Sequence, residues 1–147
     1  MVTLMTPENI IIHHSSTKDS GTVSWQAIRR FHMTDCAWEA IGYHFGIESI
    51  QDMPWAMPHY EILFGRLPDQ PGAHTKGRNH DSLGICCVGN FDSVSPLQEQ
   101  WDLCLGLVRW LMAVYGIPRE RVYGHRDFAN KTCPGTYWDM EKFRNEL

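Results

Sequence analysis

The 147 residues amount to 17.0 kDa, which is the size of one domain with a single sizeable core. Hydrophobic residues make up 43% and charged residues 20%, a globular composition that excludes a disordered or fibrous chain. A net charge of -4 and a pI near 6.0 argue against binding to nucleic acid or to an anionic membrane. We therefore expect one globular domain over residues 1–147.

The N-terminal residues lack the basic start, apolar core and small-residue cleavage site of a signal peptide. No apolar run is long enough to cross a bilayer, so we expect no membrane insertion. The five cysteines are odd in number and lack disulfide-framework spacing, which favours a reducing, cytoplasmic compartment at synthesis. We assign those in apolar contexts to the core: Cys36, Cys86, Cys87 and Cys104.

The first third of the chain predicts a strand followed by a helix. Residues 9–16 are a β-branched run that turns polar at its end, which is typical of a buried strand reaching the edge of a sheet. A helix is expected to begin at a Ser24 cap and to end near Asp35. Three large side chains share one face of this helix: Trp25, Ile28 and Phe31.

Three further runs read as strands. Residues 41–48 and 60–66 are separated by a loop with two prolines, and residues 83–88 form another apolar run. The connection between the first two contains no helix pattern, so it is not a parallel crossover. Strands interspersed with helices therefore predict an α/β fold with a central mixed sheet flanked by helices.

Two helices are expected in the last third. Ser95 and Gln98 form a capping box with Pro96 at the first helical position. The apolar periodicity then continues to Gly116, which is a typical stop signal. Residues 137–147 predict a short terminal helix.

The segment 122–135 brings a histidine, a lysine and a cysteine together just before the last helix. Zinc favours imidazole and thiolate ligands, and a catalytic site uses three protein ligands with a fourth position open. His125 and Cys133 supply two of them. The third would come from His13 or His14, and only one of these can face the metal, because successive strand residues point to opposite faces.

Lys131 stands two residues before Cys133, so the two side chains point the same way if the segment is extended, as Pro134 encourages. A cation beside a metal makes sense if negative charge develops there during a reaction. Each residue also has an ordinary explanation: a core histidine for His125, a small buried hydrophobic residue for Cys133 and a surface charge for Lys131. Spacing alone leaves both interpretations open.

Several blocks of the sequence occur in the order found in the zinc-dependent N-acetylmuramoyl-L-alanine amidases, a family that includes short phage lysozymes and peptidoglycan recognition proteins. These blocks are IIIHHSST, AIRRFH, IGYHFGI, YEILFGR, GAHTKGRN, SLGICCVGNF and GHRDFANKTCPG. They span residues 10–135 and are highly specific as a set. The chain resembles the phage-lysozyme branch in its short length and in the lysine two residues before the cysteine.

The resemblance implies that His13, His125 and Cys133 hold one Zn²⁺ per chain. Tyr43 and Lys131 match the positions that assist catalysis in the family. The family fold is a central mixed sheet flanked by helices, so the resemblance also implies a zinc amidase catalytic domain over residues 1–147.

The resemblance further implies that His44 and His74 lie at the substrate groove. Departures from the family pattern are small: Ala37 stands where many relatives carry Gly, and residues 48–59, with Trp55, match nothing that we can align. That loop leaves the substrate specificity open.

The implied reaction is hydrolysis of the amide bond between the lactyl group of N-acetylmuramic acid and the L-alanine of the peptidoglycan stem peptide. The expected partner is peptidoglycan or a soluble muropeptide, and we expect a monomer that acts on the cell wall after release. A peptidoglycan-recognition module without catalysis and a cytoplasmic wall-recycling amidase are the alternatives. A structural zinc domain would fill all four metal positions with protein ligands, and a glycosidase would pair carboxylates, and the sequence offers neither pattern.

Overall fold

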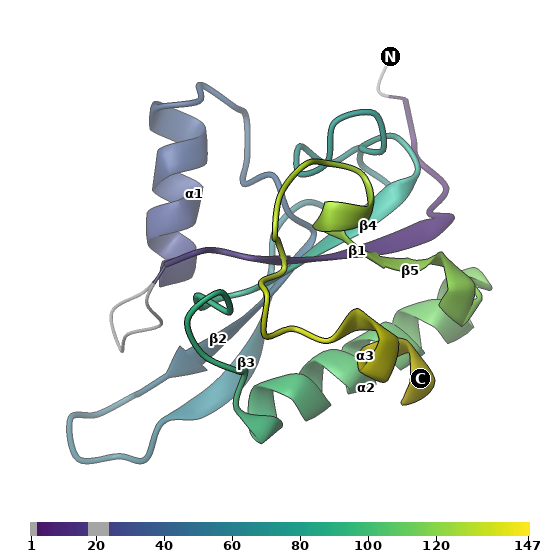
Figure 1. Cartoon of the computed structure of the whole chain (residues 1–147). Helices are drawn as coiled ribbons and strands as arrows, with labels where there is room; N and C mark the ends of the chain where they lie inside the picture. Colours follow the sequence, from purple (N-terminus) through teal and green to yellow (C-terminus); the bar gives the residue numbers. More distant parts are fainter. Residues whose placement is uncertain (1–2, 18–23) are drawn as a thin grey trace.

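The computed structural model describes residues 3–17 and 24–147 (Figure 1). Its strands are β1 (Asn9–His14), β2 (Phe45–Ile50), β3 (His59–Phe64), β4 (Ser82–Cys87) and β5 (Val122–Gly124). Its helices are α1 (Ser24–Thr34), α2 (Gln98–Tyr115) and α3 (Met140–Asn145), with short 3₁₀ turns η1 (Arg119–Arg121) and η2 (His125–Asp127). None of the helices in the described ranges has the length and apolarity needed to cross a membrane.

The strands form a sheet in the order β3-β2-β4-β1-β5. β1 runs parallel to β4 and β5, β2 runs parallel to β4, and only the β2–β3 pair is antiparallel. The mixed sheet predicted from the sequence is therefore confirmed. β5 was not predicted because three residues carry too little periodicity, yet this strand brings the segment before His125 beside β1.

Helices cover both faces of the sheet, with α1 on one side and α2 and α3 on the other (Figure 1). The larger core lies on the α2 side, where Trp101, Trp138 and Phe143 pack with ring centroids 5.0–5.6 Å apart. On the α1 side, Trp25 packs with Ile41 and Cys86. The α1 side holds the smaller core cluster, and His13 at the end of β1 lies on this side against Tyr43.

The predicted start of α2 needs correction. α2 begins at Gln98 with Leu97 in the cap position and no side-chain cap bond, so the capping box at Ser95 is wrong. Leu97 is extended, with ψ 149°, which delays the helix beyond Pro96. The predicted end is correct, because Gly116 is left-handed at φ 67° and its N–H donates to the Met112 carbonyl.

α1 covers the range predicted from the sequence, but the apolar face predicted for it is only partly buried. Trp25 is buried, whereas Phe31 is 54% exposed, because only the beginning of the helix meets the sheet. The side chain of Ser24 lies outside the described part of the chain, so its predicted capping role is not described. The Glu48 carboxylate, from β2, accepts a hydrogen bond from the Trp25 N–H at 3.1 Å and thereby caps the first turn.

Strand and helix ends shift by a few residues elsewhere. β1 ends at His14 and not at residue 16, and β2 begins at Phe45, four residues later than predicted. Residues 41–44 form an irregular segment that packs beside α1. The terminal helix is shorter than predicted, because the Asp139 carboxylate caps it by accepting from the Lys142 N–H at 2.9 Å.

Candidate metal centre

The last two residues of β1 point to opposite faces of the sheet. His13 is 1% exposed and lies on the α1 side, with its ring 5.1 Å from the Tyr43 ring and 4.6 Å from the His125 ring. His14 lies on the other side, where its Nδ1 accepts from the Phe91 N–H at 3.1 Å and its Nε2 meets the Ser16 hydroxyl at 2.9 Å. Only His13 is therefore available to a group on the α1 side.

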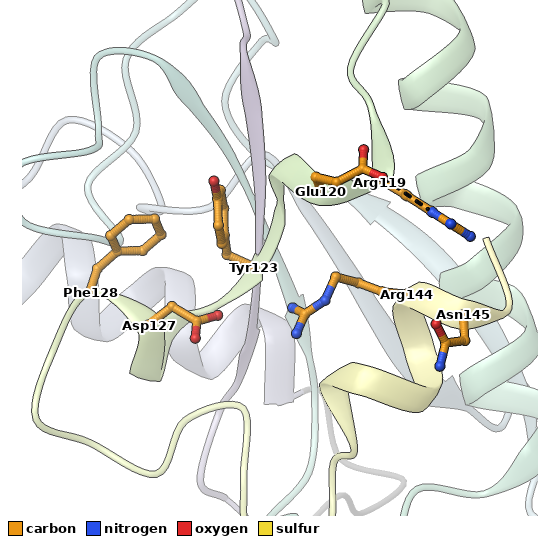
Figure 2. A pocket seen from close by; sticks show the side chains of 7 residues that line it. All are labelled: Arg119, Glu120, Tyr123, Asp127, Phe128, Arg144 and Asn145. Atoms are coloured by element: carbon orange, nitrogen blue, oxygen red, sulfur yellow. Dashed lines mark hydrogen bonds and ion pairs between the residues drawn. The ribbon is translucent and has the colours of Figure 1, made fainter.

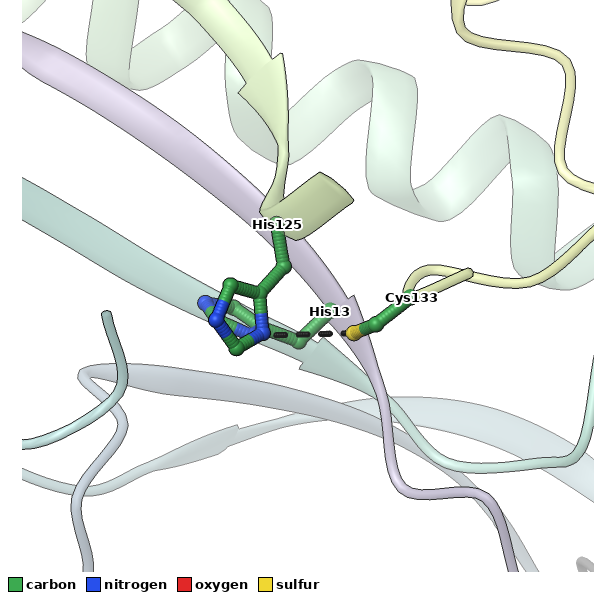
Figure 3. Close-up of side chains that lie close together, drawn as sticks. All are labelled: His13, His125 and Cys133. Carbon is green, nitrogen blue, oxygen red and sulfur yellow. Dashed lines mark hydrogen bonds between the residues drawn. The ribbon is translucent and has the colours of Figure 1, made fainter. Parts of the chain in front are cut away.

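β5 and the loop after η2 bring two more candidate ligands to His13. Gly124 pairs with Ile12 of β1, so His125 begins η2 directly beside the end of that strand. The Cys133 sulfur lies 3.8 Å from the Nδ1 atom of His13. One ligand atom from each of the three side chains can be chosen so that all lie within 4.8 Å of one another (Figure 3).

This donor set suits zinc. Bonds of about 2.0–2.3 Å to a tetrahedral zinc place its ligand atoms roughly 3.3–3.8 Å apart, so small side-chain movements suffice to close the site. Two imidazoles and a thiolate are also the ligand types that zinc prefers over magnesium or calcium. Within residues 3–17 and 24–147, no further His, Cys, Asp or Glu joins the group, which leaves a position for a non-protein ligand.

Burial keeps the side chains of the three candidate ligands neutral in the metal-free protein. Burial raises the pKa of the Cys133 thiol to about 11, although the His14 carbonyl and the Lys131 charge act in the other direction. Burial also lowers the pKa of His13 and of His125, and the Lys131 charge lowers both further. A bound dication reverses this preference at the sulfur, because it stabilises the thiolate.

The loop that carries Cys133 is held from two sides. The Arg126 N–H donates to the Cys133 carbonyl at 2.7 Å, and its guanidinium donates to the Gly135 and Trp138 carbonyls at 2.9 and 2.8 Å. From the 88–97 loop, the Asp92 carboxylate accepts from the Thr132 hydroxyl at 2.8 Å. These contacts fix the sulfur relative to η2 before any ligand binds.

We expect Arg126→Gln to lower the free energy of unfolding of the metal-free protein by about 1–3 kcal/mol, because two partly buried carbonyls lose a charged donor. Urea unfolding in chelator, with an unchanged m value, measures the loss. The control is Arg121→Gln, whose guanidinium is half exposed and forms an ion pair with Glu8 at 3.3 Å. Its effect should stay within about 0.5 kcal/mol, and an equal loss in both variants would contradict the bracing role of Arg126.

Tyr43 and Lys131 lie on the same side as the three candidate ligands. The Tyr43 ring packs between His13 and α1, where it lies 6.3 Å from the Trp25 ring and 5.8 Å from the His32 ring. Burial, and then the neighbouring Cys86 and Cys133, raise the pKa of the Tyr43 phenol well above its usual value. Tyr43 is therefore protonated at neutral pH and can donate a hydrogen bond.

The segment around Lys131 turns instead of extending. The Lys131 N–H donates to the Ala129 carbonyl, and the Gly135 N–H donates to the Thr132 carbonyl, so the backbone reverses on both sides of Cys133. The extended backbone suggested by the sequence is wrong here, because a turn closes around Pro134. Lys131 is nevertheless exposed, and its charge acts on His13, His125 and Cys133.

His44 and His74, predicted at the substrate groove, differ in burial, because His44 is buried whereas His74 is partly exposed. His44 is 0% exposed, its Nε2 donates to the Gln70 carbonyl at 2.8 Å, and its Nδ1 accepts from the Gly84 N–H at 3.0 Å. With both ring nitrogens bonded to backbone, His44 has the arrangement of a structural histidine. His74 lies behind His13, with its Nδ1 atom 3.0 Å from the Nε2 atom of His13.

Sequence reasoning missed Asp92 and Arg126 as parts of the site. Arg126 belongs to the GHRD block, so its place beside His125 was a signal that could have drawn attention to it. Asp92 gives no such signal, because it lies some forty positions before the loop that it holds.

Comparison with known proteins identifies the family. A family model described as N-acetylmuramoyl-L-alanine amidase matches residues 3–136. The chain belongs to this family. The endolysin of Enterobacteria phage T3 is 32% identical to the amidase, over 97% of this chain and 89% of the relative. Peptidoglycan-recognition protein LB of Drosophila melanogaster is 30% identical, over 86% of this chain and 53% of the relative.

The fold of the amidase also agrees with solved structures. The N-acetylmuramoyl-L-alanine amidase LysC from Clostridium intestinale superposes with a TM-score of 0.80 at 27% identity, over 97% of this chain and 86% of that chain. The family predicted from the sequence blocks is thus confirmed, and the protein is an amidase.

Two hollows of the amidase lie away from the three candidate ligands. One, of about 460 Å³, opens beside η2 and α3, where Tyr123, Asp127 and Arg144 line it (Figure 2). The other, of about 900 Å³, lies between the β2–β3 hairpin and the start of α2 and is lined by residues such as Tyr60 and Leu97. Neither hollow contains a candidate ligand, so neither supplies the chemistry of the centre.

Proposed function

We propose that the protein is a zinc-dependent amidase that hydrolyses the bond between the lactyl group of N-acetylmuramic acid and the L-alanine of the stem peptide. The observation that carries the proposal is the convergence of His13, His125 and Cys133, which lie far apart in the sequence, on one small volume. The family membership and the endolysin relatives support the same reaction.

The residues around this volume suit amide hydrolysis. An amide is a poor electrophile with a poor leaving group, so its hydrolysis needs an activated water, a stabilised oxyanion and a proton for the departing amine. A bound zinc ion supplies Lewis acidity and lowers the pKa of water. Lys131 then stabilises the negative charge that develops on the carbonyl oxygen, since its charge already acts on all three candidate ligands.

Tyr43 supplies a hydrogen-bond donor at the same place. Its phenol stays protonated because burial disfavours the phenolate, and its ring packs against His13. A phenol held there orients the attacking water or passes a proton to the L-alanine nitrogen. The segment that carries Tyr43 is itself held, because the Gly42 N–H donates to the Nδ1 atom of His32 at 3.0 Å.

An assay on purified cell wall tests the proposal. The protein should release new N-terminal alanine and no new reducing sugar, and an excess of chelator should stop the release. Zinc added back should restore it. Release of reducing ends would indicate a glycosidase, and activity unaffected by chelator would contradict the metal requirement.

The main competing function is recognition of peptidoglycan without hydrolysis, since peptidoglycan-recognition proteins are among the relatives. A module of that kind has no need of a thiolate beside two imidazoles with Tyr43 and Lys131. It would bind wall fragments in the same assay and leave the alanine count unchanged.

The setting that fits best is an endolysin that is cytoplasmic when made and acts on the wall after release, as a monomer and without nucleic acid or membrane insertion. A cytoplasmic recycling amidase would use soluble muropeptides instead. Comparing rates on intact sacculi and on soluble muropeptides separates the two. Faster turnover of sacculi is the expected outcome.

A further inference from the structure

The two ring nitrogens of His13 have different neighbours. Its Nδ1 atom lies 3.8 Å from the Cys133 sulfur, on the side of the candidate metal. Its Nε2 atom lies 3.0 Å from the Nδ1 atom of His74 and 3.3 Å from the Thr75 hydroxyl. One nitrogen therefore faces the centre, and the other faces a second layer of polar side chains.

The proton positions in this second layer follow from one carbonyl group. The Nε2 atom of His74 lies 3.2 Å from the Ser82 carbonyl, which can only accept, so this nitrogen carries a proton. In a neutral ring the Nδ1 atom of His74 is then an acceptor. The Thr75 hydroxyl also lies 3.0 Å from this Nδ1 atom. Two lone pairs facing each other across 3.0 Å would repel, so the Nε2 atom of His13 donates to the Nδ1 atom of His74, which leaves the lone pair of His13 on Nδ1.

The fold makes room for the His74 ring at two glycines. A Cβ atom at Gly72 would lie 2.4 Å from the His74 ring, and one at Gly84 would lie 2.6 Å from it. The Asn79 side-chain carbonyl accepts from the backbone N–H groups of His74 and Thr75, both at 2.8 Å. The ring thus fits closely between these two glycines, which sets its orientation.

We propose that His74 is a positioning residue, which holds His13 in the tautomer with its proton on Nε2 and so presents Nδ1 to the metal. The proposal rests on the zinc-dependent function above and gives His74 a role other than the substrate contact expected from the sequence. Partners of this kind behind a ligating histidine typically change metal affinity by 10- to 100-fold when they are removed.

The tautomer can be read directly in the unaltered protein. Long-range ¹H–¹⁵N NMR spectra of the histidine rings, recorded with and without zinc, should show His13 protonated at Nε2 in both states. A proton on Nδ1 in the zinc-free protein, or a mixture of the two forms, would overturn the proposal. This reading needs no variant, so a folding defect cannot obscure it.

Variants test the consequence for metal binding. His74→Leu should weaken zinc about 10- to 100-fold in chelator competition and should give a mixture of His13 tautomers in the NMR spectra. His74→Asn, whose amide oxygen can still accept from His13, should bind zinc within about threefold of the unaltered protein, as expected if the acceptor rather than the ring matters. Zinc affinity unchanged in His74→Leu would also overturn the proposal.

His80→Asn is the matched control, because this histidine lies in the same loop with its side chain 73% exposed. It should leave both the zinc affinity and the His13 tautomer unchanged. If the unaltered protein neither binds nor needs zinc, the proposed function fails, yet the His13 tautomer in the zinc-free state still decides the arrangement of His74. The two failures are therefore distinguishable.

Discussion

Replacing Cys133 with serine is expected to remove most of the bound zinc and nearly all of the amidase activity. Serine has almost the shape of cysteine, so the loop held by Arg126 and Asp92 should keep its fold. Its hydroxyl is a weak neutral ligand, whereas a thiolate carries a full charge to the metal. Since second-layer changes alone cost 10- to 100-fold, the loss of a direct ligand should weaken zinc by more than about 100-fold.

Metal analysis of the purified variant, at one known protein concentration, measures this effect. Cys36→Ser is the control, because Cys36 is a free thiol that is not a member of the candidate ligand group. It is partly exposed, so its predicted place in the core is wrong. The control variant should retain zinc and activity in full. Circular dichroism should show that both variants are folded, and a full complement of zinc in Cys133→Ser would remove this residue from the ligand set.

The sequence predicted those parts of the site that depend on short-range rules. The alternation of side chains along a strand separates His13 from His14, and the structure places the two on opposite faces of β1. The end of the long helix at Gly116 could be predicted equally well, because a glycine that can become left-handed is a local stop signal.

Arrangements that depend on residues far apart in the sequence could be predicted less well. β5 is too short to show a pattern, although its pairing with β1 is what brings His125 to His13. The loop that carries Cys133 is held in place by contacts to Asp92, which lies far away in the sequence. His74 was predicted at the substrate groove, but its place behind His13 depends on a slot that forms only when Gly72 and Gly84 pack against its ring.

Lys131→Ala is expected to lower turnover by roughly 100-fold or more while zinc stays bound, because loss of one oxyanion donor typically costs 2.7–4 kcal/mol of activation free energy. Lys131 is exposed and is not a member of the candidate ligand group, so its removal leaves the metal ligands in place. Steady-state kinetics on a soluble muropeptide, together with metal analysis, measure both quantities. Turnover near that of the unaltered protein would exclude Lys131 from the mechanism.

The division between kcat and KM separates two roles for this charge. A lysine that only attracts an anionic substrate would change KM and leave kcat intact, whereas a lysine that stabilises the developing oxyanion lowers kcat. Lys76→Ala removes a charge from another exposed lysine and should change kcat little. Lys131→Arg should recover part of the lost kcat, since it keeps the charge but changes the position of its donors. Such a recovery is expected only if the positive charge itself, near His125 and Cys133, stabilises the transition state.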